Sequence, residues 1–285
     1  MRHPIFLAIL LASASCFAQT QTSDTSSFLT ALQNTSSQIR AGTFDQEAFS
    51  ALLVQAKTDA TLDLPAACRL LETDLGDSNP RVSGHAAVVL HELTLRKINT
   101  ETDRQLIAST LLSCADKNKD QSTQNVCTTF VTDYGMPTSV ITQFKDVAAR
   151  KITDGTAYPW LAVGLELVAS RWPNVNADPV LAEFFRSPSV PDIVKAKAIF
   201  SLQNMPLSDA VMDAIAELLS KTKSDELKVQ IIQVSQKLGE RALEREHNML
   251  LLLEANLSES QQVRQAAGSA LRAIPQGNAT NPGIH

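Results

Sequence analysis

The stretch Val263–Pro275, VRQAAGSALRAIP, decides the fold because its frame occurs a second time in the chain. Residues Val194–Pro206 read VKAKAIFSLQNMP. Both stretches place a basic residue after the valine, an alanine four positions on, a leucine eight on and a proline twelve on. Apolar residues at i, i+4 and i+8 share one face of a helix with 3.6 residues per turn. The pattern therefore predicts an amphipathic helix that the chain uses repeatedly.

Four further copies of this frame lie between and before the two quoted stretches. The six copies begin at residues 82, 122, 157, 194, 227 and 263. A second amphipathic segment precedes each copy, so a repeat of about 36 residues predicts two helices. These first helices are expected at 64–75, 102–114, 137–152, 178–185, 208–219 and 240–255. Asn79 before Pro80 is a typical helix start, because asparagine caps free N–H groups and proline fits the first turn.

The chain divides into five predicted segments, of which the repeat array over 64–275 is the largest. One more helical pair over 26–63 departs from the frame and is expected to cap the N-terminal end, as terminal repeats often do. The segment 1–18 is predicted to be a secretory signal peptide and 19–25 a disordered linker. The segment 276–285 has no apolar periodicity and is expected to be a disordered tail.

The signal peptide prediction rests on the first residues of the chain. A short polar start precedes the apolar run Ile5–Ala12, and small residues lead to a cleavage site after Ala18. The run is too short for a bilayer, which takes about 20 apolar residues, and no later segment predicts a membrane span. A secreted or periplasmic protein is expected. As an alternative, the residues up to Cys16 resemble a bacterial lipobox, which would place a lipid anchor on that cysteine, although Ser13 stands where leucine is usual.

The second helix of each pair resembles the second helix of HEAT and HEAT-like repeats. The best match is Val263-Arg264, Ala266-Ala267 and Ala270-Leu271, while Val82–Leu90 matches without the basic residue. The resemblance covers about residues 64–275. It implies an all-α fold, a right-handed α-solenoid of about six to seven two-helix repeats. It also implies a scaffold that binds other proteins through its curved surface, without catalysis of its own.

Charge and motifs exclude several other functions. The chain has a net charge of −5 and no block of lysine and arginine, so nucleic acid is not an expected partner. No phosphate-binding loop, dinucleotide turn or nucleophile elbow occurs in the sequence. We therefore expect no cofactor and no enzyme activity. The alternative is an enzyme on the same HEAT-like frame, of the bilin-lyase type, because such chemistry leaves no simple motif.

Two stretches resemble metal sites and fail the requirements of the ion. In HELTL, His91–Leu95, a leucine stands where a zinc protease needs its second histidine. In Asp116–Cys127 the first oxygen ligands of a calcium loop are spaced correctly, but Gln121 replaces the glycine and Cys127 the bidentate glutamate. No metal site is predicted.

Cysteine spacing predicts one disulfide. Cys114 ends one expected helix and Cys127 lies in the next, so a helical hairpin can bring the two together. In an oxidising compartment we expect a Cys114–Cys127 bond. The alternative is a pair of buried free thiols. Cys68 is left over and is expected to be a buried, free cysteine.

Five residues are candidates for contact with a partner. Tyr158 and Trp172 belong to a short aromatic-rich segment, and aromatic anchors dominate many interfaces, although they also fill cores. Val88, Val163 and Phe200 fall six residues after a frame start, where the side chain should point away from the packed face. A register error of one residue would bury these three side chains instead.

Overall fold

A computed structural model describes residues 25–133 and 135–274, and this part of the protein is helical throughout, with no strand. The prediction of an all-α fold is confirmed. The helices, in chain order, are α1 (Thr25–Ala41), α2 (Gln46–Thr58), α3 (Leu64–Leu75), α4 (Pro80–Thr94), α5 (Glu101–Lys117), α6 (Gln121–Val131), α7 (Thr138–Thr153), α8 (Pro159–Arg171), the short 3-10 helix η1 (Pro173–Val175), α9 (Asp178–Arg186), α10 (Asp192–Leu202), α11 (Asp209–Lys221), α12 (Asp225–Leu238), α13 (Glu240–Ala255) and α14 (Gln261–Ala273).

The predicted segments at the two ends of the chain are largely outside this description. The expected signal peptide 1–18, with Cys16, and the expected tail 276–285 lie outside the described residues. Of the expected linker 19–25, the structure describes only Thr25, which already belongs to the first turn of α1.

Helix boundaries follow from residues that satisfy the free backbone groups at the helix ends. The Asn79 side chain accepts a backbone N–H at 3.0 Å, and Pro80 opens α4 as predicted. Thr100 and Asp103 form a reciprocal capping box at the start of α5. α12 ends at Leu238, and the next residue, Gly239, has a φ of 92° that costs glycine less than any other residue. At these three helix ends the boundary therefore follows from the local sequence.

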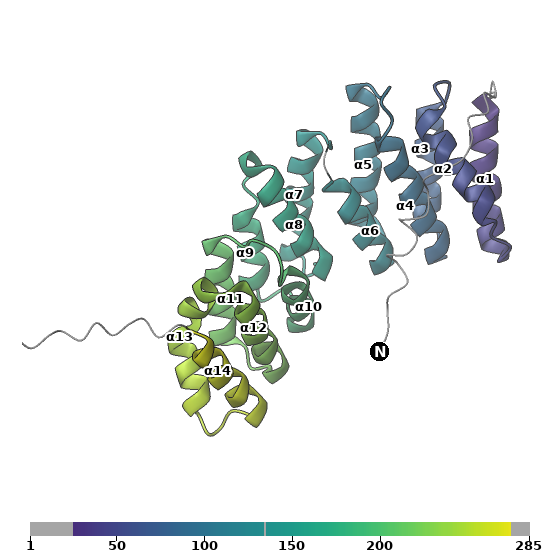
Figure 1. Ribbon diagram of the computed structural model, residues 1–285. Coiled ribbons are helices and arrows are strands. Elements are labelled where there is room, and N and C mark those ends of the chain that lie inside the picture. Colours follow the sequence, from purple (N-terminus) through teal and green to yellow (C-terminus); the bar gives the residue numbers. More distant parts are fainter. Residues whose placement is uncertain (1–24, 134, 275–285) are drawn as a thin grey trace, which may run out of the picture.

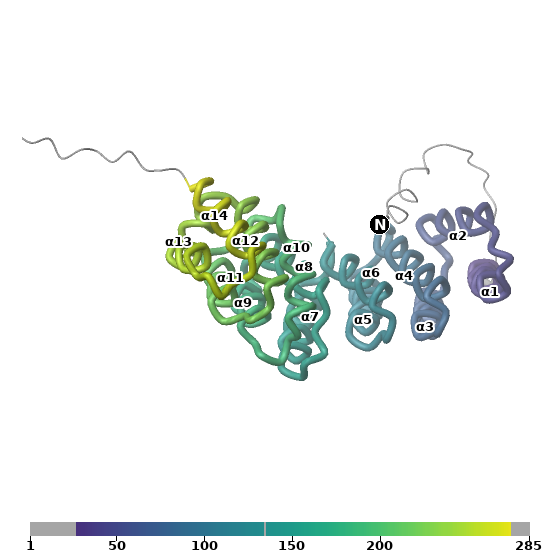
Figure 2. Tube along the Cα trace, turned by 90° about the horizontal axis from the view of Figure 1, so that it is seen from below, coloured from purple at the N-terminus to yellow at the C-terminus, as the bar shows by residue number. Residues whose placement is uncertain are grey.

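The helices pack in chain order as two rows. Each helix packs mainly against helices one or two places away in the chain: α3 lies on α4 and α5, and α12 lies on α10, α13 and α14. Odd-numbered helices make one row and even-numbered helices the other (Figure 1). The rows follow a shallow arc, with the even-numbered helices on its inner side (Figure 2). The helices that carry the sequence frame therefore line the inner side of the arc.

The frame residues are the side chains that the helices bury between them. Ala86 and Leu90 in α4 and Val263 and Ala267 in α14 are all buried. They belong to the apolar interior to which all fourteen α-helices contribute. Alanine at the middle position leaves room for close approach of neighbouring helices, and a larger side chain there would overpack the interior.

The frame copy predicted to begin at residue 122 is wrong by one residue. Ser122 is exposed, whereas Thr123, Cys127 and Val131 are buried. The Thr123 hydroxyl lies 2.8 Å from Ser83 Oγ, so this buried polar group has a hydrogen-bond partner. A threonine thus occupies the position that valine holds in other copies, which is why an apolar pattern does not reveal it.

A close helix contact occurs where α8 meets α6 and α7. Gly164 lies on the buried side of α8, and a Cβ atom there would be 2.6 Å from Phe144 Cζ and 2.7 Å from Thr128 Cγ2. Both neighbours are fully buried, so neither side chain has free space to move into. The absent side chain at Gly164 therefore allows α8 to lie close to both α6 and α7.

Candidate binding surface

The structure separates the five predicted contact residues into three groups. Phe200 is 56 % exposed on α10. Val88 on α4 and Trp172 at the end of α8 are half-buried. Tyr158 and Val163 are buried, at 3 % and 8 % exposed, so neither is available to a partner. Of the five, Phe200 presents its side chain most openly on the inner side of the arc.

The burial of Tyr158 and Val163 corrects the prediction for both residues and has a local cause. α8 is packed against α6, α7, α9 and α10, so most of its circumference is buried and Val163 has no solvent-facing side to occupy. The Tyr158 hydroxyl donates to the Ala115 carbonyl at 3.0 Å and lies 2.7 Å from Thr128 Oγ1. Burial raises the pKa of this phenol. Tyr158 is therefore a core residue with satisfied hydrogen bonds.

A groove of about 830 Å³ runs along the exposed side of α12. The floor of the groove is formed by side chains along one face of α12, from Asp225 to Lys237. Residues of α10 and α14 form its two sides. Phe200 and Val229 are the apolar residues that reach solvent in it. The lining residues are Phe200, Gln203, Asp225, Glu226, Val229, Gln230, Gln233, Val234, Gln236, Lys237 and Gln262.

Glutamine is the most frequent residue in the groove, and the five amides fall into two groups. Two of them link α12 to its neighbours. Lys237 of α12 donates to Gln203 at the end of α10, and Gln236 of α12 donates to Ser269 of α14 at 3.3 Å. The side chains of Gln230, Gln233 and Gln262 make no hydrogen bond to any residue that the structure describes. An amide offers two donors and one acceptor oxygen, so these three side chains are open to a polar ligand.

The two ends of the groove carry opposite charges. Asp225 and Glu226 lie in the first turn of α12, where the helix dipole favours acidic residues. Within the described chain neither carboxylate forms an ion pair. Lys237 lies in the last turn of the same helix. A ligand lying along α12 would therefore meet negative charge at one end and positive charge at the other.

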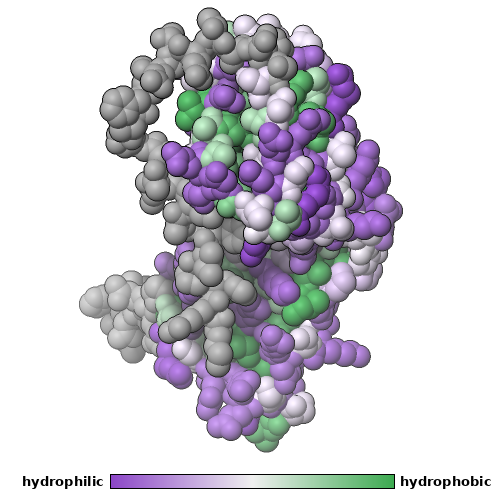
Figure 3. Space-filling view, turned by 90° about the vertical axis from the view of Figure 1, so that its right-hand side faces the viewer, coloured by the Kyte–Doolittle hydropathy of each residue, from purple (hydrophilic) through white to green (hydrophobic). Residues whose placement is uncertain are grey.

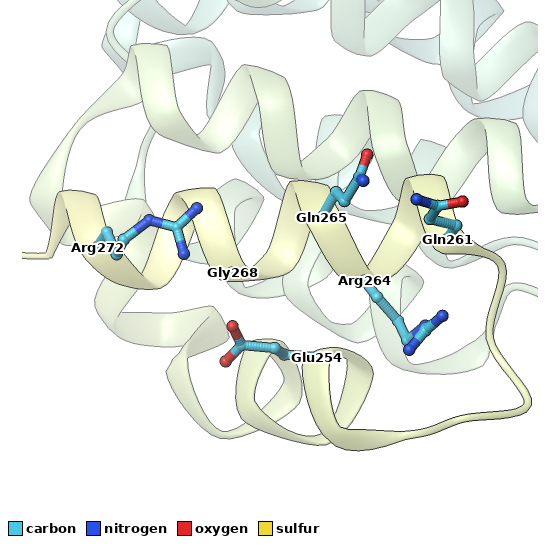
Figure 4. A pocket seen from close by; sticks show the side chains of 6 residues that line it. All are labelled: Glu254, Gln261, Arg264, Gln265, Gly268 and Arg272. Carbon is cyan, nitrogen blue, oxygen red and sulfur yellow. The ribbon is translucent and has the colours of Figure 1, made fainter.

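A second, smaller pocket of about 420 Å³ lies on the end of the array, between α13 and α14. Glu254 points towards Gly268 from α13, while Arg264 and Arg272 flank that position on α14 (Figure 4). Its other lining residues are Gln261 and Gln265, so no aromatic or aliphatic side chain lines it. This polar surface fits an end of the array that faces water rather than a further helix pair.

Apolar side chains are scattered over the face seen from the α1 end, where they form small patches among hydrophilic ones (Figure 3). Single exposed apolar residues of this kind are normal for a protein surface. The α12 groove differs because it combines an exposed aromatic ring with several open amides in one concavity. We therefore take the groove as the candidate site.

Two buried carboxyls lie apart from this groove. Glu166 in α8 and Glu246 in α13 are each 2 % exposed, and burial raises their pKa to about 7 and about 8. Ser235 Oγ donates to Glu246 Oε1 at 2.7 Å. A substrate does not reach side chains that are this deeply enclosed. Their raised pKa values therefore bear on the stability of the fold and not on catalysis.

The Cys114 and Cys127 sulfurs are joined in a disulfide, with 6.0 Å between the Cα atoms. The bond connects α5 to α6 across the short polar turn between them. Cys68 is free and buried, and burial raises the pKa of its thiol to about 12. Such a thiol is almost entirely protonated near neutral pH and is a poor nucleophile.

The turn between α5 and α6 uses its oxygens within the protein. Asp116 pairs with Arg150 at 2.7 Å, and Asp120 accepts the Thr123 N–H at 2.7 Å. Within residues 25–133 and 135–274 no group of three or more histidine, cysteine, aspartate or glutamate residues is arranged to hold a metal ion. The oxygens that resemble calcium ligands in the sequence are engaged in helix capping and ion pairing.

Comparisons with known proteins give no match: no protein-family model matches the chain, and a search of curated proteins finds no similar sequence. None of the helices in the described part of the chain has both the length and the apolar character needed to cross a bilayer. The case for a function therefore rests on the geometry of the groove.

Proposed function

We propose that this protein is a HEAT-like, right-handed α-solenoid that binds other proteins through the inner side of its arc and has no catalytic activity of its own. Three features support this proposal: the packing of helices in chain order as two rows, the frame residues buried in the second helix of each pair, and the polar end of the array at α13 and α14. Stacked helical pairs of this kind produce long concave surfaces suited to macromolecular partners.

The observation that carries the proposal is the α12 groove, with Phe200 as its exposed aromatic residue. An aromatic side chain that is free in the unbound protein and becomes buried on binding is a frequent anchor of protein interfaces. A groove with an aromatic anchor and open hydrogen-bonding groups provides both affinity and orientation.

Photo-cross-linking tests this function. A photoreactive phenylalanine analogue placed at position 200 should cross-link to one or a few proteins in an extracytoplasmic extract. The control places the same analogue at Leu252, which is similarly exposed at 64 % but lies on α13, in the other row of helices and outside the groove. A purified partner should then bind the unmodified protein and bind Phe200→Ala at least tenfold more weakly. Equal cross-linking from the two positions would contradict the proposal.

We also propose that the protein acts outside the cytoplasm, as a secreted or periplasmic protein. The apolar run near the N-terminus and the Cys114–Cys127 disulfide support this location, because disulfides persist in oxidising compartments. Sequencing of the mature N-terminus tests it, and we expect the chain to begin near Gln19. A lipid-modified Cys16 would support the anchored alternative, and an intact Met1 in the cytoplasmic fraction would exclude export.

A further inference from the structure

We propose that the α12 groove binds an extended peptide segment, reads its backbone through the free amides of Gln230, Gln233 and Gln262, and prefers a basic residue at the Asp225–Glu226 end. This inference rests on the proposed function and adds the class of partner. It has three parts, which concern the length of the groove, the chemistry of its lining and the placement of its charges.

The length of the groove suits a short extended segment. Its floor follows α12 from Asp225 to Lys237, which is about 18 Å at a rise of 1.5 Å per residue. An extended chain advances about 3.3 Å per residue, so the groove accommodates roughly five to six residues of such a segment. A segment of this size is ordered at a small entropic cost compared with a whole folded domain.

The lining favours an extended backbone over a helix. A helical ligand has already paired its own N–H and C=O groups and needs a continuous apolar stripe to rest on. The groove offers solvent only Phe200 and Val229 as apolar contacts. An extended segment has unpaired N–H and C=O groups at every residue, and an amide side chain complements both at once. The three open glutamines therefore match a peptide backbone.

The charges give the segment a preferred end. Asp225 and Glu226 have no ion-pair partner among the described residues, so a lysine or arginine next to them would form the first pair. Lys237 already donates to Gln203 at the other end. Charge complementarity of this kind orients a ligand and rejects those of the wrong sign. An acidic residue at the Asp225–Glu226 end should be disfavoured.

The test uses immobilised hexapeptide libraries and the protein from residue 19 onward. One library fixes lysine at the first or the last position and varies the others among Ala, Ser, Thr, Val and Gln; a second replaces the lysine with glutamate. The best lysine peptide is then titrated in solution against the unmodified protein and Gln233→Leu. The matched control is Gln33→Leu, because Gln33 is an exposed glutamine on α1, at the other end of the array.

We expect selective binding to the lysine library. Gln233→Leu should weaken binding about two- to tenfold and Gln33→Leu should leave it unchanged, since the net contribution of one hydrogen bond corresponds to a change of that size. N-methylation of alternate peptide nitrogens, which removes backbone donors but retains the side chains, should weaken binding by a similar factor per donor. Circular dichroism of each variant verifies that its helices are intact.

Three outcomes would overturn the inference. These are no binding by either library, binding to the glutamate library that equals or exceeds binding to the lysine library, or equal binding of the N-methylated and unmodified peptides. If the cross-linking at position 200 still identifies a protein partner, the proposed function stands and only the extended-peptide inference fails. If neither a protein nor a peptide binds, both fail.

Discussion

Gly164→Ala should destabilise the protein, although alanine is normally the better helix residue. In an unobstructed helix the change from glycine to alanine is favourable by about 1 kcal/mol. At position 164 the new Cβ would lie 2.6 Å from Phe144 Cζ, whereas carbon atoms in contact prefer about 3.5–4.0 Å. The ring would have to retreat by about 1 Å within a fully buried site. Overpacking of this size costs about 1–3 kcal/mol and the helix gain offsets about 1 kcal/mol of it, so a net loss of up to about 2 kcal/mol is expected.

Gly84→Ala is the matched control for this change. Gly84 also lies within a helix, α4, but a Cβ atom there would meet nothing within 4 Å. The same substitution should therefore stabilise the protein by about 0.5–1 kcal/mol. Because the helix gain is common to both sites, the two variants should differ in the free energy of unfolding by the overpacking cost, about 1–3 kcal/mol, with opposite signs relative to the unmodified protein.

Urea unfolding followed by circular dichroism measures the difference between the two variants. Hydrogen exchange locates it, because stacked repeats do not always unfold as a single unit. Gly164→Ala should accelerate exchange first in α6, α7 and α8, which meet at this position, and should leave α12 to α14 unaffected. If both variants shifted the unfolding midpoint in the same direction by similar amounts, the close contact at Gly164 would be refuted.

Three further predictions concern buried groups. Burial holds the pKa of Glu246 at about 8, above its usual 4.5, so the folded protein retains this proton and loses stability as the pH rises from about 4.5 through 8. Glu246→Gln should flatten that loss, so its stability relative to the unmodified protein should increase by about 3–4 kcal/mol between pH 5 and pH 8, measured by urea unfolding at both pH values. Replacing Cys114 and Cys127 with serine should cost roughly 3 kcal/mol, and a reductant should destabilise the unmodified protein but not this variant. Tyr158→Phe should cost about 1–2 kcal/mol by thermal unfolding, since it removes the hydroxyl that pairs with Thr128; no loss would mean that the hydroxyl is not needed.

The helices could be predicted from the sequence because their signal is local. A frame of apolar residues at i, i+4 and i+8 identifies the buried side of a helix, and the cap at Asn79 marks where one begins. The frame failed by one residue at Ser122 because the buried position, Thr123, is polar and is satisfied by a partner about forty residues away in the chain. A hydropathy pattern does not reveal that the Thr123 hydroxyl has a hydrogen-bond partner in Ser83.

The groove could be predicted only in part. Phe200 was found because its exposure follows from the helix period, but the same rule was wrong for Val163, where four neighbouring helices enclose α8. Gln230 and Gln262 look like ordinary surface residues in the sequence. A cluster of glutamines in α12 and α14 was the available signal, and only the packing of α10, α12 and α14 places those amides in one groove.

The packing of each helix against helices one or two places away in the chain also determines how the molecule would respond to mechanical force. Within the described residues, tension between the two ends would pass through the helix pairs in series, because the pairs touch in chain order. Extension should therefore proceed in successive steps, each releasing about one pair, rather than in a single rupture. The step that includes α5 and α6 should be shorter than the others by roughly 40 Å, because the chain between Cys114 and Cys127 cannot be drawn out while the two are bonded. A step shortened in this way would identify the unfolding of the helix pair that contains the disulfide.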